Sequence, residues 1–241
     1  MAVKILLVNE NALLRWSDMA RGTHSIKNAI IIPYDLKDFS KPLPLNGIPP
    51  HALKYFKVFE SQLLDRALYK RYLLPFKYPF YTIYNVGNHS LYPFKVCWQT
   101  MGEKLRATVI SASDLDGKLC SQKPIVPQHT IVYIPLSCRD EAHYVCSLMN
   151  SSPAQFIAQS YSMGKSFGNP HIMDYIKIPR YVPDDKVHQE LSQLSQECHE
   201  KVAAGISVTD LEEEIDELAA ELWGLTKEEL KDIKESLEEI R

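Results

Sequence analysis

The sequence predicts an α+β protein, in which a mixed α/β domain with short strands is followed by a C-terminal antiparallel helical segment. Residues 1–183 are rich in proline and contain several β-rich runs separated by turn residues. Residues 184–241 instead repeat apolar residues at helical spacing. A chain of 241 residues with 45% apolar residues can bury a sizeable core and lies in the ordinary globular range.

Seven short segments of the first part are expected to be strands, because they are rich in β-branched and aromatic residues and are bounded by Gly, Pro, Asn and Asp. These segments are residues 3–8, 28–34, 80–84, 94–98, 105–110, 129–136 and 175–179. Strands and helices do not alternate regularly along the chain, so a doubly wound sheet is not expected.

Three helices are expected among these strands. The first spans residues 49–68 after a proline pair, with one apolar face made of Leu53, Phe56, Phe59 and Leu63. The second spans residues 137–150, and the third spans residues 151–161. Ser137 and Ser152 are the expected N-terminal caps of these two helices.

The acidic part is expected to form three antiparallel helices, packed on each other or along the basic part. Their apolar seams are Val187, Leu191, Leu194 and Cys198; Leu211, Ile215, Leu218 and Leu222; and Leu230, Ile233, Leu237 and Ile240. The pairs Thr209–Glu212 and Thr226–Glu229 have the spacing of capping boxes. Gly205 and Gly224 precede these helix starts, where turns are needed.

Charge divides the chain at the same place. Residues 1–183 contain 21 Lys and Arg against 12 Asp and Glu, a balance of +9, whereas residues 184–241 contain 6 against 18, a balance of −12. We therefore expect a basic α+β domain over 1–183 that could meet a polyanion. An acidic three-helix segment over 184–241 is expected to pack on it.

Composition excludes several broad classes of protein. No apolar stretch approaches the roughly 20 residues of a membrane span, so a cytoplasmic protein without a membrane partner is expected. The five cysteines form an odd set without CxxC spacing, which indicates reduced core thiols rather than disulfides or a zinc site. No metal site is expected.

The search for catalytic motifs finds weak candidates. No glycine-rich dinucleotide motif occurs, and the "GKS" of residues 164–166 lacks the earlier glycine of a phosphate-binding loop. The "PDD" of residues 183–185 has no suitable lysine nearby for a metal-dependent nuclease. His143 and Cys146 share one helical face, which leaves a cysteine-dependent enzyme as an alternative. We expect no catalytic residue.

A basic, aromatic-rich surface is the more informative feature. Residues 75–98 interleave lysines with aromatic rings, which can pair with phosphates and stack on bases, although most such rings belong to cores. The following segment is expected to form a hairpin with a turn at Gly102. Its polar residues Gln99, Lys104 and Arg106 would project near the tip, and Gln and Arg can bind adenine and guanine edges.

Several segments of the chain resemble, in family order, the TaqI-like C-terminal specificity domain of adenine-N6 DNA methyltransferases and type IIG restriction-modification enzymes. Three of these segments are "YPFKVCWQTMGEKLRATVI", "KPIVPQHTIVYIPL" and "YVCSLMNSSPAQFIAQSYS". The others are residues 28–35, 49–67, 169–201 and 217–240. The resemblance covers residues 28–241. It implies a target-recognition domain that binds double-stranded DNA and is not catalytic by itself.

In that family a separate N-terminal domain holds S-adenosylmethionine and the flipped adenine, through motifs that this sequence lacks. The resemblance therefore implies no cofactor in this chain, and a methyltransferase catalytic domain, fused or separate, as its partner. The chain would be a cloned fragment, a split specificity subunit or the product of a truncated gene. Residues 1–27 fit the family least.

The resemblance also suggests a role for the polar loop of residues 160–171, which would read DNA together with the hairpin. Its expected DNA-binding residues are Lys165, Ser166, Asn169 and His171. Gly164 and Gly168 would allow the backbone to approach a phosphate closely. Two other function classes stay open: a protein-interaction scaffold built on the C-terminal helices, and the cysteine-dependent enzyme.

Overall fold

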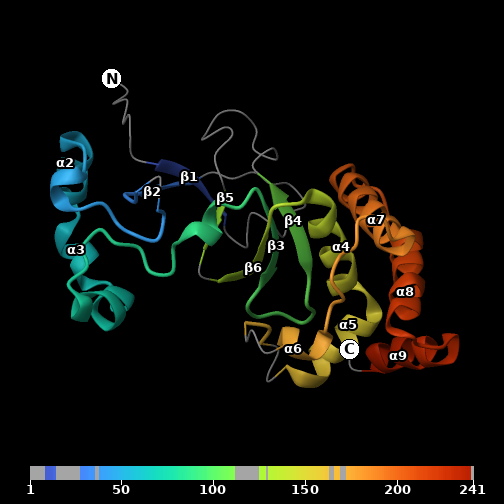
Figure 1. Cartoon of the computed structure of the whole chain (residues 1–241). Helices are drawn as coiled ribbons and strands as arrows, with labels where there is room; N and C mark the ends of the chain where they lie inside the picture. Colours follow the sequence, from blue (N-terminus) through green and yellow to red (C-terminus); the bar gives the residue numbers. More distant parts are fainter. Residues whose placement is uncertain are drawn as a thin grey trace.

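The computed structural model describes residues 9–14, 28–35, 38–111, 125–128, 130–162, 166–168 and 172–239. It is an α+β fold, as the sequence predicts. In Figure 1 a small helical lobe lies at one end, two small sheets lie in the middle, and helices α7, α8 and α9 lie at the other end.

The central sheet is antiparallel, with strand order β4-β3-β6. Strand β3 (Phe94–Gln99) pairs with β4 (Ala107–Ser111) on one side and with β6 (Ile131–Leu136) on the other. All three strands lie in predicted segments rich in β-branched and aromatic residues. Alternate residues of β3 point to opposite faces of the sheet, so Val96 and Trp98 share one face.

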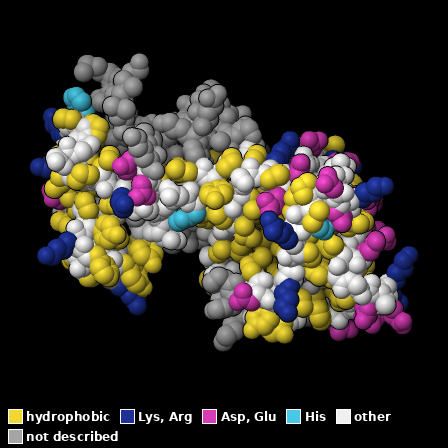
Figure 2. Space-filling view, in the orientation of Figure 1, with side chains coloured by type: hydrophobic (Ala, Val, Ile, Leu, Met, Phe, Trp, Pro, Cys, Tyr) yellow, Lys and Arg dark blue, Asp and Glu magenta, His cyan; other side chains and the backbone are white. Residues whose placement is uncertain are grey.

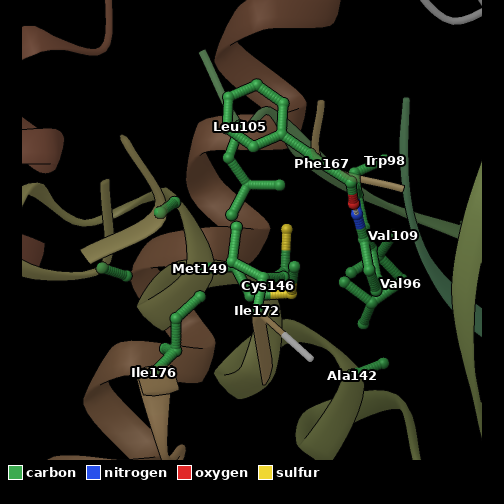
Figure 3. Close-up of a cluster of buried hydrophobic side chains, with 12 residues drawn as sticks. Val96, Trp98, Leu105, Val109, Ala142, Cys146, Met149, Phe167, Ile172 and Ile176 are labelled. Carbon is green, nitrogen blue, oxygen red and sulfur yellow. Dashed lines mark hydrogen bonds between the residues drawn. The ribbon is translucent and has the colours of Figure 1, made fainter. Parts of the chain in front are cut away.

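Three helices cover that face: α4 (Arg139–Asn150), α5 (Ser152–Tyr161) and the short α6 (Ile172–Ile176). Together with the sheet they bury an apolar cluster, which Figure 3 shows. The cluster consists of Val96, Trp98, Leu105, Val109, Ala142, Cys146, Met149, Ala154, Ala158, Phe167, Ile172 and Ile176. Burying one large apolar side chain contributes about 1.5–3 kcal/mol, so this cluster is a main source of stability.

The second sheet has strand order β2-β1-β5. Strand β1 (Asn9–Leu14) pairs antiparallel with β2 (Asn28–Ile32) and parallel with β5 (Ile125–Pro127). Strand β2 was predicted, but β1 and β5 were not. The strand expected at residues 3–8 lies outside the described residues.

The helix expected over residues 49–68 is in fact broken in two. Helix α2 (Pro50–Val58) ends at Phe59, and α3 (Glu60–Asp65) ends before Arg66. The Phe59 amide donates to Phe56 O at 3.0 Å, a tight final turn that closes α2. Phe59 is consequently exposed, whereas Phe56 is buried as expected.

A π-helical turn, η2 (Tyr69–Leu73), and three 3-10 turns, η1 (Leu45–Gly47), η3 (Leu74–Phe76) and η4 (Asn88–Leu91), lie in and beside this lobe. The lobe has its own core, made of Ile48, Ala52, Phe56, Tyr69, Leu73, Phe80 and Tyr81. The guanidinium group of Arg66 donates to the carbonyls of Phe80 and Thr82 at 2.6 and 2.9 Å.

Two predicted strands are wrong. Residues 80–84 form turns, because Phe80 and Tyr81 fill the lobe core and Arg66 takes up backbone carbonyls that a strand would need. Residues 175–179 are not a strand either, since helix α6 runs to Ile176 and Lys177 adopts a left-handed φ of 49°. In both segments tertiary packing overrides the β-propensity of the residues.

The acidic part forms helices α7 (Lys186–Ala203), α8 (Thr209–Trp223) and α9 (Lys227–Glu239). The Thr226–Glu229 capping box is confirmed, with Thr226 N donating to Glu229 Oε2 at 2.8 Å. The box expected at Thr209 is not formed, because Val208 is the N-cap and has no side-chain oxygen. Gly205 and Gly224 take the left-handed φ values of 74° and 69° that favour glycine in turns.

The caps of the two preceding helices also differ from prediction. Cys138, not Ser137, is the N-cap of α4, and no side chain bonds there. Ser152 is the first residue of α5 rather than its cap. Its amide and hydroxyl donate to the two carboxylate oxygens of Asp216, at 2.6 and 2.7 Å, and Asp216 also pairs with Lys234 at 3.0 Å. One buried carboxylate thereby ties α5, α8 and α9 together.

The buried Lys95 of the central sheet should make the stability of the protein depend on pH. Its side chain is 2% exposed, its ammonium donates to Tyr92 O at 2.7 Å, and burial lowers its pKa to about 8. The unfolded chain keeps this lysine protonated up to about pH 10, so between about pH 8 and pH 10 the unfolded state binds more protons. The contribution of Lys95 to the free energy of unfolding should therefore rise with pH in this range, by at most about 1.4 kcal/mol per unit. The thiols of Cys97, Cys146 and Cys198, whose pKa values are raised by burial, contribute in the opposite direction.

We expect Lys95→Met to remove this rise and to be at least as stable as the parent near pH 7, because the buried charge is gone. Urea unfolding at several pH values would measure both effects. Lys57→Met, at an exposed lysine of α2, is the matched control and should keep the parent's pH slope. Equal slopes in the parent and Lys95→Met would contradict the prediction.

Candidate nucleic-acid interface

The turn between β3 and β4 is joined to the polar loop that follows α5. Met101 and Ser166 form an isolated antiparallel bridge, and the Phe167 amide donates to Thr100 O at 2.7 Å. The indole N–H of Trp98 donates to Phe167 O at 3.1 Å, the dashed line in Figure 3. Two segments about which the sequence makes separate predictions are thus held side by side.

Gly168 permits this close approach, and Gly102 leaves room within the turn itself. A Cβ built on Gly168 would lie 3.0 Å from Cβ of Thr100, so a side chain there would push the loop away from the turn. A Cβ on Gly102 would lie 1.8 Å from Nε2 of Gln99. The Gln99 amide therefore lies over the turn, in space that a side chain at position 102 would take.

The predicted DNA-binding residues fall into three groups. Gln99 and Ser166 are half-buried and belong to the joined turn and loop. Lys104 is half-buried and Arg106 is exposed, and both line a cavity on the side of the C-terminal helices. The remaining three, Lys165, Asn169 and His171, lie outside the described residues.

This cavity has a volume of about 730 Å³ and lies between the start of β4 and helices α4, α5, α7, α8 and α9. Another part of its lining, the acidic wall, includes Glu212 and Asp216. Burial and the neighbouring Asp216 raise the pKa of Glu212, while Lys104 and Arg106 act to lower it. The positive charges of Lys104 and Arg106 are therefore partly neutralised by carboxylates of the same chain.

Two residues that the sequence analysis missed hold the outer edge of β4. Asn150 accepts from the Ala107 amide at 2.8 Å and donates to the Ala107 carbonyl at 2.9 Å. His199 Nε2 accepts from the Val109 amide at 3.1 Å, while its Nδ1–H donates to Ser195 O at 2.7 Å. No local sequence signal could reveal these contacts, because they join positions far apart in the chain.

The thiol and imidazole of helix α4 lie in the core rather than in an open site. Cys146 is fully buried, and burial raises the pKa of its thiol to about 12. His143 Nδ1 lies 3.1 Å from the Ser195 hydroxyl, and its pKa falls to about 3 because of burial, with smaller effects from His199 and Arg139. A neutral, inaccessible thiol is a poor nucleophile, so this pair does not favour cysteine catalysis.

The other motifs have structural roles in the described part of the chain. Asp185, within the acidic "PDD", accepts from the His188 amide at 3.1 Å and caps α7. Among the residues that the structure describes, no group of three or more His, Cys, Asp or Glu side chains could hold a metal ion. None of the described helices is both long and apolar enough to cross a membrane.

The seams of the C-terminal helices are used within the chain. Leu191, Leu194, Leu211 and Ile215 are buried together with Tyr144 and Leu148 of α4. In the third seam Leu230 is buried, Ile233 and Leu237 are half-buried, and Ile240 lies outside the described residues.

Comparison with known proteins does not place the chain in a family. No protein-family model matches it, and a search of curated proteins finds no match.

The junction of turn and loop yields a stability prediction. Gly168→Ala should lower the free energy of unfolding by about 1 kcal/mol or more, because the added methyl group overpacks the contact with Thr100. It should also speed hydrogen exchange at the Phe167 amide, which bonds to Thr100 O. Ser166→Ala, which keeps the backbone bridge, is the control and should change stability by less than about 0.5 kcal/mol. Parent-like stability and exchange in Gly168→Ala would contradict the contact.

Proposed function

We propose that this chain is the target-recognition part of an adenine-N6 DNA methyltransferase or type IIG restriction-modification enzyme, and that it reads duplex DNA without catalysing a reaction. The observation that best supports the proposal is the bridge between Met101 and Ser166. It joins the two segments for which the sequence suggests base-reading residues.

Sequence reading needs side chains that match base edges and a backbone that holds them in place. The Gln99 amide can form a paired hydrogen bond with adenine, and the Ser166 hydroxyl can donate or accept. Both residues are anchored through the central sheet, because Trp98 and Phe167 beside them are fully buried. Base-contacting side chains on a rigid support lose little conformational entropy when DNA binds.

The distribution of charge suggests how DNA would be oriented. Residues 1–183 carry a balance of +9 and residues 184–241 one of −12. Helices α7, α8 and α9 lie together at one end of the molecule, where Figure 2 shows many Asp and Glu side chains. A polyanion is repelled from that end, so the duplex would approach the turn and loop from the other side.

The proposed partner is a domain that supplies the methyl-transfer reaction, which we do not assign to this chain. A methyltransferase catalytic domain, fused or separate, would hold S-adenosylmethionine and the flipped adenine. This chain would close over the other side of the duplex and would need no cofactor of its own.

The proposal is tested by selecting bound sequences from a pool of random duplexes, using the full chain at about 50 and about 200 mM salt. We expect enrichment of a short motif. Gln99→Ala should relax the preference at one position, since a paired contact to a base contributes about 1–3 kcal/mol of discrimination. Binding without any enrichment, or no binding at low salt, would contradict sequence reading by this chain alone.

The acidic wall of the cavity gives a second test. If Lys104 and Arg106 contact phosphates, Glu212 competes with the DNA for them, so Glu212→Gln should raise affinity several-fold at low salt. Glu214→Gln removes the same charge from an exposed position of α8 that does not line the cavity, and should have a smaller effect. Equal effects of the two variants would mean that the cations act through net charge alone. Fluorescence anisotropy with a labelled duplex measures the difference.

A further inference from the structure

Exposed apolar side chains are concentrated in the helical lobe and the segment that follows it. Among the described residues, 18 large apolar side chains are exposed, and 12 of them lie between Leu45 and Tyr92. Figure 2 shows this gathering on the lobe that contains α2 and α3. The other six are Met101, Tyr161, Tyr175, Val182, Val202 and Ile206. A concentration of this kind marks a binding surface more often than chance exposure.

The aromatic run of residues 75–98 divides into buried and exposed rings. Phe80, Tyr81 and Trp98 belong to the cores described above. The exposed rings of the run are Phe76, Tyr78, Tyr84 and Tyr92; we define the aromatic face as the first three of these together with Tyr72, which stacks on Tyr84. Phe76 is 75% exposed, which is unusual for a phenylalanine that has no partner surface to cover.

Part of the aromatic face is already arranged as a stack. The rings of Tyr72 and Tyr84 lie 4.9 Å apart with an interplanar angle of 28°. The Arg71 guanidinium lies 5.1 Å from the centre of the Tyr72 ring. A planar base could extend such a stack, and the arginine could meet the phosphate beside that base.

The backbone at Lys77 presents the other two rings. Lys77 adopts a left-handed conformation with a φ of 58°, a position that glycine normally takes at the end of a helix. Its amide donates to Leu74 O at 3.0 Å, and the next amide, of Tyr78, donates to Leu73 O at 3.2 Å. This reversal leaves Phe76, Lys77 and Tyr78 exposed in succession, so an exposed cation stands between two exposed rings in the sequence.

The charge around these rings favours a polyanion over a protein. Of the five Lys and Arg in residues 66–102, Arg71 and Lys77 are exposed beside these rings. Of the other three, Lys70 pairs with Asp65, Arg66 donates to backbone carbonyls and Lys95 is buried. Lysine is depleted at protein–protein interfaces, whereas lysine and arginine interleaved with rings are typical of surfaces that bind unpaired nucleic acid. From this combination we infer that the aromatic face binds single-stranded nucleic acid by stacking its unpaired bases. This goes beyond the proposed function, because the face lies apart from the turn and loop and requires no duplex.

The test uses the full chain and a fluorescein-labelled oligothymidylate of about 20 nucleotides, followed by anisotropy at about 50 and about 200 mM salt. We expect salt-dependent binding that Phe76→Ala with Tyr78→Ala weakens about tenfold or more. Lys77→Gly, which suits the left-handed backbone but removes the charge, should weaken binding and reduce the salt slope.

The matched control is a second exposed pair of rings elsewhere in the chain. Tyr55 and Phe59 lie 5.3 Å apart with an interplanar angle of 61°, and they are 46% and 41% exposed. Tyr55→Ala with Phe59→Ala removes exposed aromatic surface outside the aromatic face and should leave binding to the oligonucleotide unchanged. An equal loss in both double variants would overturn the assignment to the aromatic face.

The outcome separates this inference from the proposed function. Enrichment of a duplex motif, with no affinity for the single strand, would overturn the inference and leave the proposed function standing. Single-strand binding that depends on Phe76 and Tyr78, with no preference for any duplex sequence, would support the inference and overturn the proposed function. If the chain ignores the oligonucleotide and instead self-associates through these rings in sedimentation experiments, the face is a protein interface and the inference is wrong.

Discussion

The burial of helix α4 is the constraint on which the rest of the structure depends. One side of the helix, with Ala142, Cys146 and Met149, closes the core under the central sheet. Another side, with Tyr144 and Leu148, packs against α7 and α8. A helix buried on nearly all sides fixes both neighbours at once, because neither can shift without opening a cavity. The acidic helices are therefore part of the same packed body as the sheet.

This packing also determines the electrostatics of the candidate interface. Asn150, at the end of α4, holds the backbone of Ala107, and α8 is held against the same helix. Lys104 and Arg106 precede that anchored strand and so line the same cavity as Glu212, whose pKa they act to lower. Glu212 therefore competes with any anion for Lys104 and Arg106. The net attraction of an anion to this site is the attraction by the two cations minus the repulsion by the carboxylate.

The sequence predicted what depends on local pattern and missed what depends on contacts between distant residues. Alternation and β-branched residues identified β2, β3, β4 and β6, and heptad-like spacing identified α7, α8 and α9. The same composition misled at residues 80–84, where the lobe core needs Phe80 and Tyr81. For the candidate site, the sequence indicated Gln99 and Ser166 but not the bridge between Met101 and Ser166 that joins their segments. It also did not indicate that Lys104 and Arg106 would share a cavity with carboxylates, because both features depend on how separate elements pack.

The side chains on the outer edge of β4 have a consequence for how the molecule behaves among its own copies. The unpaired backbone groups of an exposed edge strand can pair with a strand of another molecule, which leads to aggregation. Here Asn150 and His199 occupy the amides of Ala107 and Val109, so they terminate sheet growth on that side without a covering strand. The histidine does this only as a neutral ring, since Nε2 must accept a hydrogen bond. Protection of this edge therefore depends on a single tautomer of one imidazole, with the proton on Nδ1 held by Ser195 O and Nε2 left to accept.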